Sequence, residues 1–313
     1  MIQNLAFNYP FRFCILVHDE EQINIIRILI YGFYCKAFSS EVYSEVRQAF
    51  RAVFFYLIPI RKEVALSNLA MCFPEKDEKW KQDILKKCYI NLGINLFEIL
   101  YLPRMRKELL DTFISFEQHH LIVESLKKGN GVFFISGHLS NWEITAFSYA
   151  KIFRGKLNVL AKPQSNKFVD EKLNHYRELS GNEIIPTGAT IRNVFEKILR
   201  NEIVCFLVDQ SAHPVYSVYA DFFGHKVATF SGPAKMALKY KTELIFAYSV
   251  RNQNYKYFIS VEKINYDDIQ EYNDGNIKIL TERINKKLEK VIRENPDQWL
   301  WFHRRFKHIK DEK

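Results

Sequence analysis

The sequence has few cysteines and none of the spacings that hold a disulfide framework or a metal ion. Its five cysteines are an odd number, and no two of them form a Cys-x-x-Cys pair. The histidines show no His-Glu-x-x-His motif or other zinc-ligand spacing. These absences argue against a small disulfide-stabilised secreted fold, and they predict a protein of the reducing cytosol without a metal centre.

No apolar run reaches the roughly 20 residues that a helix needs to cross a bilayer. The best candidates, residues 23–35 and 49–60, are short, and Arg27 and Arg51 interrupt them. Both stretches place large apolar side chains beside basic ones, which is typical of a helix lying in the membrane interface. Amphipathic helices that pack on the protein core have the same pattern, so both interpretations stay open. A secretory signal is not indicated, because no basic region precedes a clean apolar core.

Common catalytic and nucleic-acid-binding signatures are missing too. The chain contains no Gly-rich phosphate loop and no Gly-x-Ser-x-Gly elbow, which argues against a P-loop nucleotide-binding protein and a serine hydrolase. Its 45 basic residues are spread along the sequence without a zinc-finger, RNA-binding or helix-turn-helix motif. The net charge of +9 instead predicts an acidic partner or an anionic surface.

The 313 residues divide into a helical part followed by alternating strands and helices. Apolar periodicity and helix-breaking prolines predict helices at residues 40–58, 61–71 and 77–102. Short apolar runs then predict strands at 132–135, 157–161, 183–185, 203–208, 243–250 and 257–261. Helices are predicted between and after these strands at 142–153, 167–179, 190–200, 232–240 and 277–294.

This alternation is typical of an α/β fold with a mixed, largely parallel central sheet flanked by helices. We expect a helical, membrane-proximal region over residues 1–110 and an α/β domain over residues 111–313. Residues 221–224 and 229–233 are interpreted as a connection that shapes the mouth of a pocket. The same residues also fit a simple turn and a helix start, with Ser231 as the cap and Pro233 in the first turn.

Residues 131–143, Gly-Val-Phe-Phe-Ile-Ser-Gly-His-Leu-Ser-Asn-Trp-Glu, carry the clearest chemical pattern. The apolar run predicts a strand that delivers His138 to the carboxyl end of the sheet, where ligands gather in α/β folds. In a catalytic interpretation, His138 is a general base and Glu143 fixes its tautomer. In a structural interpretation, Ser140 and Glu143 form a capping box at the start of a helix. The spacing alone leaves both interpretations open.

Other polar side chains are expected at the same edge of the sheet. Asp209 and Gln210 directly follow a predicted strand, where they suit a ligand site or an ordinary strand-ending turn. Lys162, Arg177 and Arg192 fall at a strand end or on helices beside that edge. Such basic side chains can hold phosphate groups, although a solvated helix face has the same composition.

An ordered series of short motifs runs from about Phe54 to Lys307, over most of the chain. It comprises Arg61-Lys62, Asn68-Leu69, Cys72-Phe73-Pro74-Glu75, Gly93, Glu98, Gly131, Gly137-His138, Asn141-Trp142-Glu143, Arg177, Gly181, Asp209-Gln210, Phe222-Phe223-Gly224, Gly232-Pro233-Ala234 and the tail 296–307. In this order the series resembles the bacterial lipid A biosynthesis acyltransferases of the lauroyl/myristoyl type, within the wider lysophospholipid acyltransferase group. The resemblance implies a glycerolipid acyltransferase-like fold.

The resemblance also implies a reaction and a set of site residues. His138 and Glu143 match the family's catalytic His-x4-Asp/Glu pair, so His138 would deprotonate a hydroxyl that attacks the thioester of an acyl carrier protein or coenzyme A. No cofactor beyond this co-substrate and no covalent enzyme intermediate are expected. Backbone amides near Gly137 are candidate oxyanion donors. The expected substrate-binding residues are Arg177, Lys162, Arg192, Asn141, Asp209 and Gln210.

The family would place the protein on the cytoplasmic face of the inner membrane, as a peripheral or monotopic O-acyltransferase. Its partners would be an acyl thioester donor, an anionic glycolipid acceptor of lipid A type and the membrane surface, with no nucleic acid. Residues 1–40 are charged and irregular, whereas family members usually begin with an apolar anchor, so the mode of attachment stays open. The alternatives are the same chemistry on a lysophospholipid or another glycolipid, and a non-enzymatic membrane- or carrier-binding protein.

Overall fold

The computed structural model describes residues 60–187 and 191–310. The helix predicted at residues 40–58 and the two apolar stretches at 23–35 and 49–60 therefore lie outside the described residues, apart from Ile60. In the described part of the chain, none of the helices combines the length and the apolar character that a membrane crossing requires.

Two helices precede the sheet. Helix α3 (Lys62–Cys72) and helix α4 (Glu78–Tyr101) confirm the predictions for residues 61–71 and 77–102. Helix α4 begins where the Asp77 carboxylate accepts a hydrogen bond from the amide of Trp80 at 2.7 Å, which satisfies one of the otherwise unpaired amides of the first turn. The 3₁₀ turn η3 (Leu102–Arg104) and the short helices α5 (Lys107–Phe113) and α6 (His120–Lys127) follow and were not predicted.

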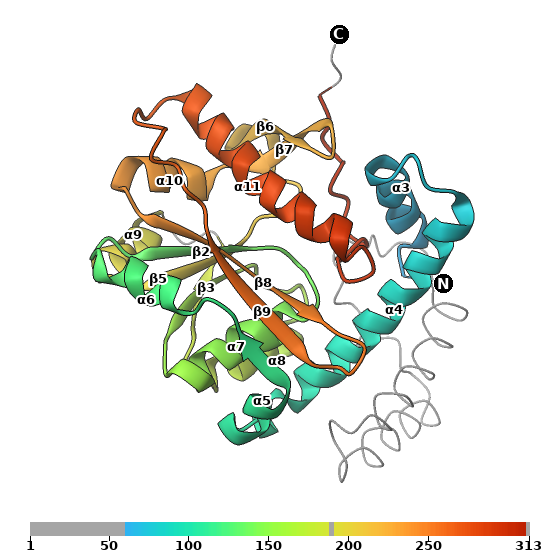
Figure 1. Cartoon of the computed structure of the whole chain (residues 1–313), viewed down its shortest axis with the longest axis horizontal. Helices are drawn as coiled ribbons and strands as arrows, with labels where there is room; N and C mark the ends of the chain where they lie inside the picture. Colours follow the sequence, from blue (N-terminus) through green and yellow to red (C-terminus); the bar gives the residue numbers. More distant parts are fainter. Residues whose placement is uncertain (1–59, 188–190, 311–313) are drawn as a thin grey trace.

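A seven-stranded sheet forms the centre of the molecule (Figure 1), in the order β1-β9-β8-β2-β5-β3-β4. Neighbouring strands are parallel except for the antiparallel pair β8–β9. The fold class predicted from sequence is thus confirmed. The strands are β1 (Ile114–Phe116), β2 (Val132–Ser136), β3 (Leu157–Ala161), β4 (Glu183–Pro186), β5 (Ile203–Leu207), β8 (Glu243–Arg251) and β9 (Tyr257–Lys263).

Helices cover both faces of this sheet, which is why its central strands read as continuous apolar runs. Phe133 of β2 faces a core shared with α10 and α11, whereas its neighbour Phe134 faces Tyr149 of α7. The flanking helices are α7 (Trp142–Phe153), α8 (Lys167–Glu178), α9 (Ile191–Leu199), α10 (Gly232–Tyr240) and α11 (Asp274–Glu294). All five were predicted from sequence to within a few residues.

The region between β5 and α10 folds as a hairpin that the sequence pattern did not predict. Strand β6 (Ser217–Phe222) pairs antiparallel with β7 (His225–Phe230). Phe223 and Gly224 make the turn with φ angles of 54° and 79°, so the turn was predicted correctly but its strands were not. Ser231 occupies the predicted cap position of α10, yet its hydroxyl makes no capping hydrogen bond.

The N-terminal helices share their core with the sheet. Leu69 of α3 and Tyr89 of α4 are fully buried in the same apolar cluster as Phe133 and Val204 of the central strands. This packing attaches α3 and α4 to the face of the sheet that α10 and α11 also cover. The division of the chain near residue 110 stays a prediction.

Candidate active site

His138 and Asp209 meet at the carboxyl edge of the sheet because they follow two adjacent parallel strands. Strands β2 and β5 are in register, with Ser136 opposite Leu207. Just beyond that pair, the Nδ1 atom of His138 lies 2.7 Å from Oδ1 of Asp209. The backbone amide of His138 donates to Oδ2 of the same carboxylate at 2.6 Å. A Cβ atom at Gly137 would lie 3.1 Å from that oxygen and 2.7 Å from Cδ1 of Leu288, so the turn has little room for a side chain.

Asp209 is held as a carboxylate by three donors. Besides the two groups of His138, the indole Nε1 of Trp299 donates to Oδ2 at 2.7 Å. Burial raises the pKa of Asp209, but the attraction of His138 and the three hydrogen bonds outweigh this effect and lower the pKa to about 2. An ionised carboxylate only accepts hydrogen bonds, so Nδ1 of His138 carries the proton.

The other ring nitrogen of His138 is therefore a hydrogen-bond acceptor whenever the imidazole is neutral. The side-chain amide of Gln210 lies beside it, with 3.3 Å between the two Nε2 atoms. Trp142 packs its ring edge-on against the imidazole, with 4.7 Å between the ring centroids. A histidine with a buried carboxylate on Nδ1 and an acceptor at Nε2 has the arrangement of a general base.

Glu143 lies close to this pair but binds a different partner. Its carboxylate accepts two hydrogen bonds from the Arg177 guanidinium, at 2.8 and 2.6 Å, and one from the Trp142 indole at 3.1 Å. Burial raises the pKa of Glu143, but Arg177 outweighs burial and the pKa is lowered. The predicted contact of Glu143 with the His138 ring is thus corrected: Asp209 takes that place, because α7 directs Glu143 toward α8.

The predicted capping box is also corrected. Helix α7 begins one residue later than a Ser140 cap would require, and the side chain of Asn141 caps it by accepting from the Ile144 amide at 3.1 Å. Ser140 adopts a left-handed conformation with φ 51°, and its buried hydroxyl has no hydrogen-bond partner among the described residues. Glu143 does not reach back to Ser140, since Arg177 engages both of its oxygens.

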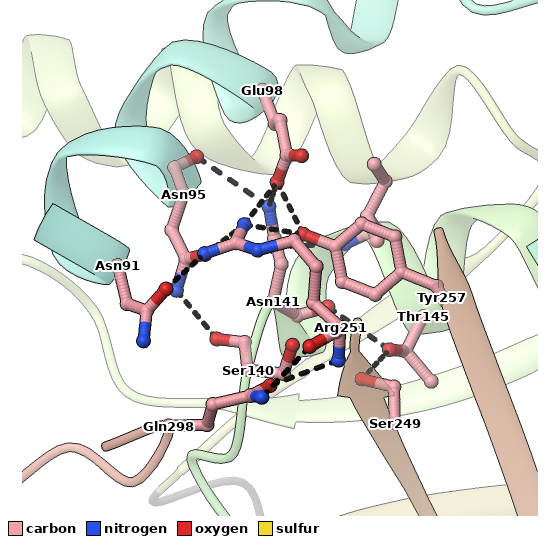
Figure 2. A network of polar contacts seen from close by, with 11 residues as sticks. Asn91, Asn95, Glu98, Ser140, Asn141, Thr145, Ser249, Arg251, Tyr257 and Gln298 are labelled. Atoms are coloured by element: carbon pink, nitrogen blue, oxygen red, sulfur yellow. Dashed lines mark hydrogen bonds and ion pairs between the residues drawn. The ribbon is translucent and has the colours of Figure 1, made fainter. Parts of the chain in front are cut away.

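A buried polar network from α4 holds the backbone beside His138 (Figure 2). Asn95 donates to the carbonyl oxygen of Ser140 at 2.5 Å, and Asn141 donates to the Glu98 carboxylate at 2.8 Å. Asn141 is only 1% exposed, and both ends of its side-chain amide are engaged. It therefore supports the loop and does not reach the cavity, which corrects the prediction of a substrate contact.

Arg251, at the end of β8, lies at the centre of this network. Its guanidinium donates to Tyr257 at 2.7 Å, to Asn91 at 2.6 Å and to Glu98 at 3.3 Å. Glu98 is fully buried, and Arg251 is nearly so. The network therefore joins α4, two strands and the His138 loop through one buried ion pair.

The C-terminal segment completes the support of the site. The side-chain amide of Gln298 pairs with the backbone of Arg251 at both its nitrogen and its oxygen, and the Gln298 carbonyl accepts from the Ser140 amide at 2.7 Å. The amide of Leu300 donates to the His138 carbonyl at 3.0 Å. Trp299 lies between these two anchors and holds Asp209. In the sequence, Trp299 stood out only through its place in the tail 296–307 that resembles the family.

A cavity of about 510 Å³ opens beside His138 and extends between α7 and the sheet. Its charged lining residues Lys162, Arg304 and Lys307 are exposed, so we place its mouth there, whereas most of its apolar lining residues are buried. The apolar lining residues are Phe116, Ile122, Phe134, Tyr149, Val159, Ala247, Ile259 and Val261. A cavity of this composition suits a hydrocarbon chain whose reactive end lies near the imidazole.

Comparison with known proteins identifies the family. The family model described as bacterial lipid A biosynthesis acyltransferase matches residues 25–308, which include the whole of the site. This chain belongs to that family.

Curated relatives of the chain are similar over most of both sequences. The lipid A biosynthesis palmitoleoyltransferase of Escherichia coli K12 is 23% identical over 256 residues, which are 79% of this chain and 79% of that protein. The myristoyltransferase of the same organism is 21% identical over 239 residues, 76% of this chain and 72% of that protein. Lipid A biosynthesis acyltransferase 2 of Shigella flexneri is 21% identical and covers 76% and 74%.

The protein is therefore an acyltransferase, and the structure shows which expected residues can reach its cavity. Lys162, Arg177 and Gln210 line the cavity. Arg192 does not: its side chain is 81% exposed on α9 and forms an ion pair with Glu196. The prediction that Arg192 contacts substrate is corrected, because its helix directs it to solvent.

Three of the backbone amides near Gly137 that were expected to donate to an oxyanion have partners within the protein. The amides after Gly137 are engaged within the protein, since that of His138 donates to Asp209 and that of Leu139 donates to the Gly137 carbonyl. The amide of Ser140 is bound to Gln298. The side-chain amide of Gln210 is the polar donor that the structure places beside the imidazole.

Proposed function

We propose that this protein transfers a fatty acyl chain from an acyl thioester to a hydroxyl group of a lipid A precursor, with His138 as the general base. The observation that carries the proposal is the His138–Asp209 pair at the entrance of an apolar cavity. The family supports the reaction class, and its name supports the acceptor. The donor is an acyl carrier protein or coenzyme A thioester.

The reaction proceeds in one transfer without a covalent enzyme intermediate. Nε2 of His138 takes the proton of the acceptor hydroxyl while the hydroxyl oxygen attacks the thioester carbonyl carbon. The tetrahedral intermediate then expels the thiolate, which receives the same proton from the imidazolium. The products are an ester and a free thiol. Asp209 stabilises the imidazolium between the two steps, because its carboxylate stays ionised beside Nδ1.

Gln210 is the proposed oxyanion donor. Its amide nitrogen lies 3.3 Å from Nε2 of His138, and both residues line the cavity. A donor beside the base can stabilise the developing negative charge without a backbone amide from the His138 turn. Arg177, which forms an ion pair with Glu143, lines the same cavity as Lys162. Both side chains are proposed to contact the anionic part of a substrate.

A purified-protein assay tests the function. We expect the full-length protein, given a lipid A precursor in mixed micelles and a palmitoyl or lauroyl thioester, to increase the precursor's mass by one acyl group. A lysophospholipid in the same assay tests the alternative acceptor. Acylation of the lysophospholipid alone would replace the lipid A proposal. The cytoplasmic face of the inner membrane is the proposed site of action, since both substrates meet there.

The apolar cavity leads to a prediction about chain length. Ala247 is 7% exposed and lines the cavity, so Ala247→Leu shortens the space for a hydrocarbon chain. Each methylene denied burial loses about 0.8 kcal/mol, so we expect the ratio of kcat/KM for palmitoyl over lauroyl donors to fall by about tenfold or more. Both kcat/KM values are measured on the same preparation, so a misfolded fraction lowers them equally and leaves their ratio unchanged. An unchanged ratio would place the acyl chain elsewhere.

A further inference from the structure

Three basic side chains at the cavity mouth have no role in the chemistry described above. Arg61 precedes α3, while Arg304 and Lys307 belong to the C-terminal segment, and all three line the cavity. Arg304 and Lys307 are exposed and Arg61 is half-buried. The fold thus brings residues from opposite ends of the described chain to one place.

The first two of these side chains are close enough to repel each other. The Arg61 guanidinium donates to the carbonyl oxygen of Phe302 at 3.2 Å, which fixes it against the segment that carries Arg304. Burial and the nearby charge of Arg304 both lower the pKa of Arg61. Arg61 itself adopts a left-handed conformation with φ 47°. Two like charges held together cost free energy unless an anion lies between them.

The protein supplies no such anion in its described part. Glu143 is the acidic residue that lines the cavity, and both of its oxygens are bound to Arg177. Within residues 60–187 and 191–310, none of Arg61, Arg304 and Lys307 forms an ion pair with a carboxylate. Among the described residues, these three positive charges therefore have no carboxylate partner.

This charge lies next to the reacting centre. His303 lines the same cavity as Arg61 and His138, and burial lowers the pKa of its ring, with smaller contributions from the charges of Asp209, His138 and Arg61. Its buried Nδ1 has no hydrogen-bond partner among the described residues. An anion bound by the arginines would thus share the cavity with the general base.

We propose that Arg61, Arg304 and Lys307 form a phosphate-binding subsite at the mouth of the active site. The subsite rests on the proposed function, in which a substrate must present its reacting group to His138. Guanidinium groups bind phosphate through paired, charge-assisted hydrogen bonds, and a flanking lysine adds a point charge. The phosphate belongs to the acceptor's headgroup or to the phosphopantetheine arm of the donor.

The test compares phosphorylated substrates with matched forms that lack the phosphate. One arm uses a lauroyl thioester of 4′-phosphopantetheine against the same thioester of pantetheine. The other arm uses a lipid A precursor before and after phosphatase treatment. In one of the two comparisons, we expect the wild type to have a kcat/KM about ten- to a hundredfold higher with the phosphorylated substrate than with the unphosphorylated one. A charge-assisted hydrogen bond contributes a free energy that corresponds to this factor. The comparison that shows the preference identifies whether the donor's phosphate or the acceptor's phosphate binds the subsite.

The double variant Arg304→Ala with Lys307→Ala is expected to abolish this preference by lowering kcat/KM with the phosphorylated form. Arg192→Ala is the matched control, because it also removes an exposed arginine but lies outside the cavity. It should keep the preference. A wild type without any preference would overturn the subsite, as would a double variant that keeps it or a control that loses it equally.

A binding measurement separates failure of the subsite from failure of the proposed function. Inorganic pyrophosphate is expected to raise the Tm of the wild type and of Arg192→Ala, but not that of the double variant, since a ligand that binds only the folded state stabilises it. This readout needs no turnover. Absence of acyl transfer with a clear Tm shift would reject the proposed reaction and keep the anion site. Acyl transfer with no shift and no preference would reject the subsite alone.

Discussion

Replacing His138 by alanine is expected to lower the rate of acyl transfer by about 10²- to 10⁴-fold, because a positioned general base contributes a factor of that size. The change leaves the loop's backbone bonds to Gln298 and Asn95 in place, so the fold should survive. Initial rates with saturating donor and acceptor, measured beside a thermal melt, check both expectations. A variant that keeps the parent rate would show that His138 does not take the proton.

Two carboxylate variants decide which acid supports the base. Asp209→Asn removes the charge that orients Nδ1 and stabilises the imidazolium, so we expect it to lose nearly as much rate as His138→Ala. Glu143→Gln weakens the contact with Arg177 but leaves the imidazole's partner intact, so its kcat should fall by less than about tenfold. The reverse order of effects would return the orienting role to Glu143.

The second large effect concerns stability. Arg251→Met is expected to lower the free energy of unfolding by about 3–5 kcal/mol, because it breaks a buried ion pair by removing the guanidinium beside the fully buried Glu98 carboxylate. Unfolding in urea, followed by circular dichroism, measures the change.

Two further variants show that the loss comes from the broken pair. The double variant Arg251→Met with Glu98→Gln should recover part of the stability, since it removes the buried charge as well. Arg283→Met breaks a closer ion pair, in which two hydrogen bonds of 2.7 Å join Arg283 to Asp268, but this pair is at an exposed site, so its effect should be much smaller. Equal losses for Arg251→Met and Arg283→Met would contradict the importance of burial.

This network also fixes the position of the catalytic pair, although its residues are not themselves part of that pair. Asn95 and Asn141 hold the loop after His138, and Gln298 attaches the segment that carries Trp299. The loop after His138 and the Trp299 segment that holds Asp209 are thus both tied to Arg251 and its neighbours. A loss of activity in variants of this network is expected to accompany the loss of stability.

Much of the architecture was readable from local patterns. The helices from α7 to α11 and the central strands were predicted because buried parallel strands are continuous apolar runs and helices repeat their apolar positions every three to four residues. The hairpin β6–β7 was missed, since its strands are only partly buried and lack a continuous apolar run. A turn was one of the two interpretations of residues 221–224, and the structure shows it, with Phe223 and Gly224 in left-handed conformations.

The sequence by itself determined that His138 follows a buried strand at the carboxyl edge of an α/β sheet, and its ordered motifs indicated the family. It did not decide which acid serves the imidazole. Glu143 is near His138 along the chain, but α7 turns it toward Arg177, whereas Asp209 reaches the ring because β5 lies beside β2. Strand adjacency depends on contacts between distant segments, which a local pattern does not encode. For the same reason, only the tertiary structure brought Arg61 beside Arg304 at the cavity mouth.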